Sequence, residues 1–206
     1  FTANIAPASL GLLNVAAASK TYDNTGAATV SGTLTGVLPG DTVNLGLTGQ
    51  FSDANVGTAK TVTWAATTAG ADAGNYVLAP AIGTVQANIT PATLTYTASP
   101  VAGTVGQTLP VLTGNVGGFV GTDTLAGATT GTLSWTTAAT VASSAGSYAV
   151  AGGGLAALNY VFVQAAGNAT ALTLQAATTA DASTTATTVV TTTALFSVQL
   201  PVTMSS

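Results

Sequence analysis

The segment ANIAPASL at residues 3–10 returns as ANITPATL at residues 87–94, an offset of 84 residues. Two further pairs of segments repeat in the same order. NYVL at residues 75–78 returns as NYVF at 159–162 with the offset of 84, and GVLPGDTV at 36–43 returns as GFVGTDTL at 118–125 with an offset of 82. Three pairs in one order at nearly one spacing indicate two diverged copies of a module of about 84 residues.

Each copy has the pattern of short strands separated by turns. Val62, Trp64 and Ala66 alternate with threonines in the first copy, and Leu133 and Trp135 alternate with Ser and Thr in the second. Strict alternation of this kind is typical of a half-buried β-strand. Thr and Val, which are abundant here, favour strands, whereas frequent Gly interrupts helices.

We therefore predict an all-β (mainly β) fold of two tandem small modules. Each is either a β-sandwich of the Ig-like kind or a β-grasp-like fold, and a short helical turn near residues 41–45 or 123–128 would favour the second alternative. A strand-forming tail is expected to follow them. The predicted core contains the large aromatic residues Trp64, Tyr76, Trp135, Tyr148 and Tyr160.

The predicted domains meet at Pro91. Because proline lacks a backbone donor and keeps the residue before it extended, the last strand of one module should run almost directly into the first strand of the next. A junction this short is expected to restrict bending and to give a rod-like stalk. The predicted parts are an orphan terminal strand at 1–6, a first β module at 7–90, a second at 91–174, and an Ala/Thr-rich tail at 175–206 with a strand at 196–204.

Both ends of the chain carry a spare strand pattern. Residues 1–6 match the end of the first module's last strand, and apolar residues alternate with polar ones across 196–204. A spare strand that joins another chain's sheet satisfies its own backbone groups, and a head-to-tail contact of that kind builds a fibre. The predicted assembly strands consist of Phe1, Ala3, Ile5, Phe196, Val198, Leu200, Val202 and Met204.

Composition excludes several classes of function. Charged residues make up 4% of the chain, against about 25% in ordinary soluble domains. Nucleic-acid binding requires clustered Lys and Arg, and the chain has two such residues. Without His or Cys, acid–base and nucleophilic chemistry would depend on Asp and Lys alone, so we predict no enzymatic activity, no catalytic residue, no metal site and no cofactor. No apolar run reaches about 18 residues, so no transmembrane segment is expected.

Two repeated pairs of polar residues are candidates for a specific role. Asp41 and Asp123 occupy equivalent positions after Gly-containing turns and are interpreted as Asx-turn or cap residues. The alternative, a calcium ligand, lacks the usual density of carboxylates. Tyr76 and Tyr160 are interpreted as buried tyrosines whose hydroxyls meet a backbone group, with a glycan-stacking platform as the alternative.

Lys20 raises one covalent hypothesis. A buried lysine beside an asparagine and a carboxylate can form an isopeptide cross-link, and Asn55 or Asn75 would be its partner here. The default interpretation is a surface lysine whose aliphatic stem covers apolar surface.

Several short motifs resemble those of a known family. KTYD at 20–23, NVGT at 55–58 and DAGNY at 72–76 are similar to the YDG-type repeat of filamentous-haemagglutinin-like bacterial secreted adhesins, although Asn24 stands where that repeat usually has Gly. Residues 92–174 resemble the companion MBG-type repeat through LTY at 94–96 and AGSY at 145–148. The resemblance implies export, repeats that build long adhesins, and no catalytic residues.

The function expected from these observations is a structural or adhesive segment of a secreted bacterial surface protein, located outside the cell or on its surface. The assembly hypothesis is polymerisation into an extracellular filament by strand donation. The alternatives are passive stalk repeats of a longer adhesin and a glycan-binding module. The expected partners are copies of the chain itself in a head-to-tail homopolymer, or a glycan or protein of a host or cell surface.

Overall fold

The computed structural model of the protein describes residues 3–177. Phe1–Ala176 forms one compact unit. Strands account for 53% of the structure and helices for 7%, which confirms the prediction of an all-β fold of two tandem domains. The strand predicted at 196–204 lies outside the described residues.

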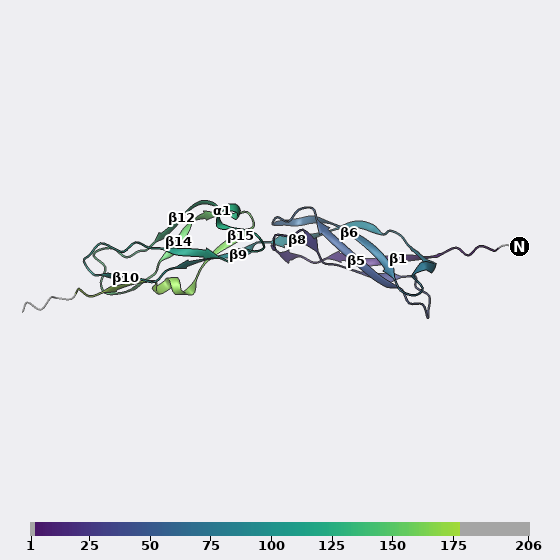
Figure 1. Ribbon diagram of the computed structural model, residues 1–206, viewed down its shortest axis with the longest axis horizontal. Coiled ribbons are helices and arrows are strands. Elements are labelled where there is room, and N and C mark those ends of the chain that lie inside the picture. The colour runs from purple at the N-terminus through teal and green to yellow at the C-terminus, as the bar shows by residue number, and fades with distance from the viewer. Residues whose placement is uncertain (1–2, 178–206) are drawn as a thin grey trace, which may run out of the picture. The chain divides into compact units, whose positions relative to one another are not determined.

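The first module is built from two β-sheets (Figure 1). A three-stranded sheet has the order β4-β1-β7, and a five-stranded sheet has the order β2-β8-β6-β5-β3. Strand β1 contacts β8, and β4 contacts β5, so the two sheets pack together. The strands are β1 (Ala8–Ala17), β2 (Lys20–Thr21), β3 (Ala27–Ala28), β4 (Val30–Thr35), β5 (Asn44–Phe51), β6 (Gly57–Ala69), β7 (Tyr76–Leu78) and β8 (Ile82–Thr90), with a 3-10 turn, η1 (Ala73–Asn75), before β7.

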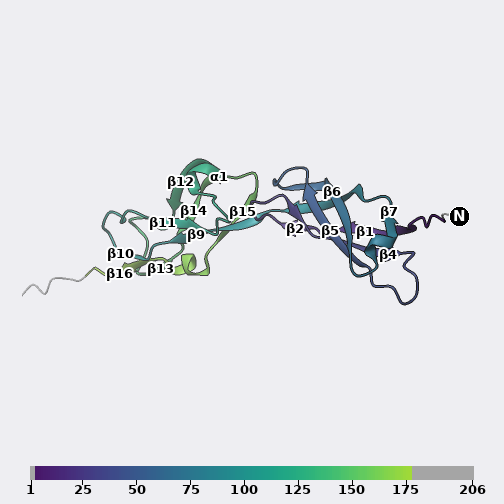
Figure 2. The same cartoon turned by 45° about the vertical axis from the view of Figure 1, so that its right-hand side comes forward.

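The second module has three smaller sheets. Their orders are β11-β9-β15, β10-β16-β13 and β12-β14, and Figure 2 shows β10, β16 and β13 together. Strand β14 contacts β9 of the first of these sheets. The elements are β9 (Ala92–Ala98), β10 (Val101–Thr104), β11 (Gly114–Gly117), α1 (Leu125–Ala128), β12 (Thr130–Thr136), β13 (Gly146–Tyr148), β14 (Ala151–Ala156), β15 (Tyr160–Gln164), η2 (Ala166–Thr170) and β16 (Leu172–Gln175).

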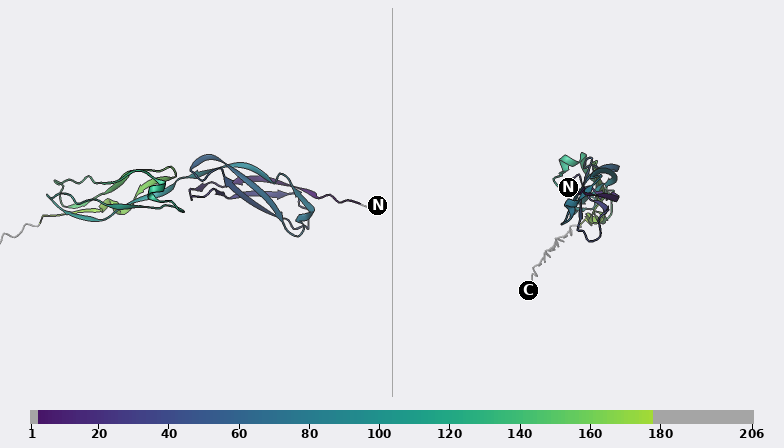
Figure 3. Two further views of the ribbon diagram at one scale, coloured as in Figure 1. Left: turned by 45° about the horizontal axis from the view of Figure 1, so that its top comes forward. Right: turned by 90° about the vertical axis from the view of Figure 1, so that its right-hand side faces the viewer.

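The helices are too short to cover a sheet. Helix α1 has four residues, about 6 Å of axis, and Figure 3 shows it as a single coil beside the strands. It forms at one of the two predicted positions, 123–128, and Thr124 caps it by accepting a hydrogen bond from the Gly127 amide at 3.2 Å. The other predicted position, 41–45, is a turn that leads into β5. A β-grasp fold needs a helix across its sheet, so the described residues fit the sandwich alternative.

No helix within residues 3–177 has both the length and the apolar character needed to cross a membrane.

The two modules share one sheet with the same register. Strand β1 pairs in parallel with β7, placing Ala8 opposite Tyr76, and β9 pairs in parallel with β15, placing Ala92 opposite Tyr160. The antiparallel pairs β1–β4 and β9–β11 also correspond residue for residue. Every one of these positions is related by the offset found in the sequence, so the structure reproduces the internal repeat.

The same turn closes this sheet in both modules. Gly36 and Gly118 have φ values of +90° and +103°, a region that favours glycine. A Cβ at Gly36 would lie 2.6 Å from the carbonyl oxygen of Ser9, and one at Gly118 would lie 2.4 Å from that of Thr93. The chain after each glycine therefore lies directly against the first strand of its module.

Three of the five predicted core aromatics are buried, namely Trp64, Tyr76 and Tyr160. The prediction was wrong for Trp135 and Tyr148, which are only partly buried and pack beside the core cluster around Val150 and Leu172. Trp135 covers Gly114 and Gly152, where an added Cβ would lie 2.4 and 2.8 Å from its ring. The indole thus fills space left by two glycines, and it belongs to a two-stranded sheet that leaves part of the ring open.

Two further tyrosines, Tyr22 and Tyr96, are buried although the strand patterns did not predict it.

Candidate functional site at the inter-module junction

One residue separates the last strand of the first module from the first strand of the second. Strand β8 ends at Thr90, β9 begins at Ala92, and Pro91 stands between them. The backbone is hydrogen-bonded on both sides: the Tyr22 amide donates to the Thr90 carbonyl at 2.8 Å, and the Ala92 amide donates to the Asn159 carbonyl at 3.0 Å. Both flanks of the proline are therefore held by their own module.

Two tyrosines, one from each module, share one carboxylate. The Tyr22 hydroxyl donates to Asp123 Oδ2 at 2.9 Å, and the Tyr160 hydroxyl donates to the same atom at 2.7 Å. The Val120 amide donates to the Tyr160 oxygen at 3.1 Å. The two rings meet edge to face, with centroids 5.3 Å apart and planes at 79°, an arrangement that adds to the stabilisation by area burial.

Amide side chains bond across the same boundary. Asn159 Oδ1 accepts from the Val56 amide at 2.9 Å, and Asn159 Nδ2 donates to Asn55 Oδ1 at 3.0 Å. Asn24 Nδ2 donates to Thr122 Oγ1 at 3.3 Å. We call the whole set the junction: it consists of Tyr22, Asn24, Asn55 and Val56 of the first module with Thr122, Asp123, Asn159 and Tyr160 of the second.

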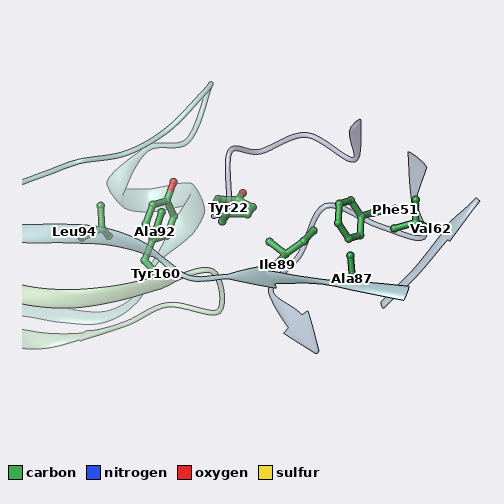
Figure 4. Close-up of a cluster of buried hydrophobic side chains, with 8 residues drawn as sticks. All are labelled: Tyr22, Phe51, Val62, Ala87, Ile89, Ala92, Leu94 and Tyr160. Atoms are coloured by element: carbon green, nitrogen blue, oxygen red, sulfur yellow. The ribbon is translucent and has the colours of Figure 1, made fainter. Parts of the chain in front are cut away.

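The hydrophobic cores of the two modules join beneath these polar contacts. A single cluster of buried side chains includes members of both modules, and Figure 4 shows them following one another along β8 and β9. Tyr22 lies between Tyr160 and Ile89 in this view. The buried members are Tyr22, Phe51, Val62, Ala87 and Ile89 of the first module and Ala92, Leu94 and Tyr160 of the second.

Burial and the shared carboxylate keep both phenols protonated. Burial raises the pKa of Tyr160 to about 12; the amide of Val120 opposes this rise, and the hydrogen bond to Asp123 adds to it. The pKa of Tyr22 is raised by burial first and then by its hydrogen bond to Asp123. Protonated phenols are donors, which is what a carboxylate between them requires.

Half of this arrangement already exists inside each module. In the first module the Tyr76 hydroxyl donates to Asp41 Oδ2 at 2.6 Å and accepts from the Leu38 amide at 3.0 Å. Tyr160 makes the equivalent bonds in the second. The tyrosine–aspartate pair thus holds the turn against the sheet within a module, and the junction adds the second tyrosine, Tyr22.

These contacts correct the interpretation of the aspartates. Asp41 and Asp123 accept tyrosine hydroxyls, and neither was predicted to do so. The predicted contact of Tyr76 and Tyr160 with a backbone group is confirmed, since each hydroxyl accepts from a backbone amide. Their burial leaves no open ring face for a glycan. Within residues 3–177, no three His, Cys, Asp or Glu residues are grouped so as to hold a metal ion.

The two lysines pair with nearby aspartates. Lys20 Nζ lies 2.8 Å from Asp23 Oδ1 and donates to the Thr25 carbonyl at 2.7 Å. Lys60 Nζ lies 2.7 Å from Asp53 Oδ1. The ammonium group of Lys20 lowers the pKa of Asp23. These partners are not the asparagines that the cross-link hypothesis named.

The assembly strands stay a prediction. Residues 3–7 form no strand in the single chain, and the side chain of Ile5 is 92% exposed; Ala3 is exposed as well. Phe1 lies outside the described residues, as do Phe196, Val198, Leu200, Val202 and Met204.

Sequence reasoning did not identify Tyr22, Asn24 and Asn55 as contact residues. They belong to the motifs KTYD and NVGT, which carried the family resemblance but had no assigned role. The available signal was that both motifs exist in only one copy of the repeat, which is expected of residues that face the other module.

The tyrosine pair predicts a loss of stability at alkaline pH. A tyrosine in the unfolded chain ionises near pH 10, whereas Tyr160 in the folded chain ionises at about 12. Within that window the unfolded state releases a proton that the folded state retains, so stability falls as pH rises and is unaffected below the window. Chemical denaturation at a series of pH values should show this fall, and Tyr160→Phe should make it shallower. Tyr148→Phe is the control, because that hydroxyl donates to the Ser144 carbonyl and not to a carboxylate. An equal slope in Tyr160→Phe and wild type would contradict the assignment.

The chain matches two domain families in sequence. Residues 6–84 match the YDG domain, and residues 94–170 match the MBG domain of the YGX type. No curated protein and no solved structure matches the chain. The two matched segments contain the two sides of the junction, with Tyr22 in one and Asp123 in the other. The chain thus carries a YDG domain followed in tandem by an MBG domain of the YGX type.

Proposed function

We propose that this chain is a structural segment of an exported bacterial surface protein, in which the YDG and MBG domains act together as one stiff spacer. The observation that carries the proposal is the junction. A single linking residue, a carboxylate bonded by both domains and a shared apolar cluster leave little freedom between them. Domains joined by flexible linkers lack such contacts.

The chemistry of the described residues supports a structural role. Both lysines are engaged by aspartates, and Asp41 and Asp123 are engaged by tyrosines. The ionisable groups therefore serve contacts within the fold. In this proposal the chain performs no catalysis and takes no cofactor, and its location outside the cell follows from its resemblance to secreted adhesins. A spacer of this kind would carry an adhesive region, with a surface glycan or protein as partner.

Stiffness can be measured by NMR relaxation of the full chain. If the junction holds, amides of the two domains share one rotational correlation time. Inserting about ten Gly and Ser residues after Pro91 should separate them into two faster values, because such a linker behaves as a flexible coil. The control places the same insertion between Gly106 and Gln107, an exposed turn within the second domain, and should leave the common value intact.

Two independent correlation times in the unmodified chain would contradict the spacer. So would an insertion after Pro91 that changes nothing, since the domains would then be held by something other than the junction.

Fibre formation by strand donation is the second candidate, and the exposure of Ile5 favours it. An extended apolar segment without a partner strand can add to the sheet edge of another chain. In this proposal the donated strand is 196–204 or 1–6. Deleting Leu195–Ser206 should abolish polymers, seen by light scattering and electron microscopy, while both domains keep their thermal transitions. Polymers that persist after the deletion, or a full chain that stays monomeric at high concentration, would exclude strand donation by the tail.

A further inference from the structure

The first module carries the same receiving group that the second module offers to Tyr22. Asp41, Tyr76 and the Leu38 amide are bonded to one another as Asp123, Tyr160 and the Val120 amide are. We call the receiving surface of the first module the set Ile5, Leu38, Asp41 and Asn75. By the internal repeat these residues correspond to Ile89, Val120, Asp123 and Asn159.

The apolar members of the two sets differ in burial. Ile89 is 1% exposed, whereas Ile5 is 92% exposed. Val120 packs against the apolar cluster shared by both modules, whereas Leu38 is 58% exposed. In the second module these apolar contacts are made by the neighbouring module, so their exposure in the first module marks a position where a neighbour is missing.

The polar members differ in the same sense. Asp123 accepts two tyrosine hydroxyls, whereas Asp41 accepts that of Tyr76 and, among residues 3–177, of no second tyrosine. Asn159 bonds to Asn55 and to the Val56 amide, whereas Asn75 is exposed to solvent. Residues 5–7, Gly74 and Asn75 line an open hollow on this surface.

We propose that the receiving surface docks the tyrosine-bearing end of another YDG-type module, placed N-terminal to residue 3. The partner would supply a tyrosine to Asp41 as Tyr22 does to Asp123, an amide to Asn75, and an apolar cover for Leu38. Ile5 would complete the last strand of the partner, as Ile89 completes β8. The inference stands on the repeat within this chain and holds whether or not the chain acts as a spacer.

One position defines which partner fits. Asn24 closely approaches Gly121, where an added Cβ would lie 3.0 Å from the Asn24 Cβ. The corresponding residue of the receiving surface is Pro39, which has the bulk that Gly121 lacks. The partner should therefore carry a smaller residue at the position of Asn24. Because Asn24 has a φ of +64°, glycine is the residue that relieves the contact and keeps the backbone conformation.

The test inserts a second copy of residues 8–86 between Thr2 and Ala3 of the full chain, with Asn24→Gly in the added copy. Residues 3–6 can then complete the last strand of the added copy. The readout is the amide hydrogen exchange of Leu38, with Val120 as the internal reference for an occupied surface. Docking should slow the exchange of Leu38 by about tenfold or more and bring it toward that of Val120.

The matched control is Tyr22→Phe in the added copy alone. It removes one hydroxyl and should return the Leu38 exchange most of the way to its value in the natural chain. If the added copy shows protected amides of its own while Leu38 exchanges as it does in the natural chain, the proposal is overturned. It is equally overturned if Tyr22→Phe in the added copy has no effect on Leu38.

A second variant tests the surface without an added module. Substituting Phe119→Val, Val120→Leu, Gly121→Pro and Thr122→Gly gives the second module the residues found at 37–40, and Asn24→Gly accompanies them. If this surface can receive a tyrosine, Tyr22→Phe should raise the unfolding equilibrium constant of the grafted chain by about tenfold, as one hydrogen bond to a carboxylate predicts. A change below about twofold, or two modules that tumble independently after grafting, would overturn the proposal.

Discussion

The carboxylate of Asp123 is the contact on which the relation between the two domains depends. A charged group enclosed by protein is costly unless hydrogen bonds replace its water, and Tyr22 and Tyr160 supply two such bonds from opposite sides of the boundary. Neither bond can be removed without leaving an acceptor that the other domain no longer satisfies. Because only Pro91 links the strands, the geometry at this one carboxylate restricts both domains together.

The chain achieves this contact with very few charges. At 4% charged residues it has almost no ion pairs available, and its two lysines are used locally. Neutral donors take their place: phenols at Asp123 and amides at Asn159. The tyrosine–aspartate pair first holds a turn within its own module and then receives the neighbouring one. A single repeated unit therefore provides both the fold of a module and its means of attachment.

Much of the fold could be predicted from the sequence, because strand alternation and the repeat are local signals. The offset of 84 residues is reproduced in the pairing of Ala8 with Tyr76 and of Ala92 with Tyr160. The junction could not be predicted in the same way. Tyr22 and Asp123 are 101 residues apart, and periodicity carries no information on contacts at that range. Burial of Trp135 was overestimated for a related reason: alternation shows which face is apolar, and not how completely another layer covers it.

A double-mutant cycle between Tyr22→Phe and Asp123→Ala tests the central claim most directly. The stability of the wild type, both single variants and the double variant would be measured by chemical denaturation of the full chain. A direct hydrogen bond to a carboxylate predicts a coupling energy of about 1–2 kcal/mol. The reference cycle pairs Asp123→Ala with Tyr148→Phe and should couple by less than about 0.5 kcal/mol. A coupling of Tyr22 to Asp123 no larger than that reference would contradict the account, because the two domains would then not be joined through this carboxylate.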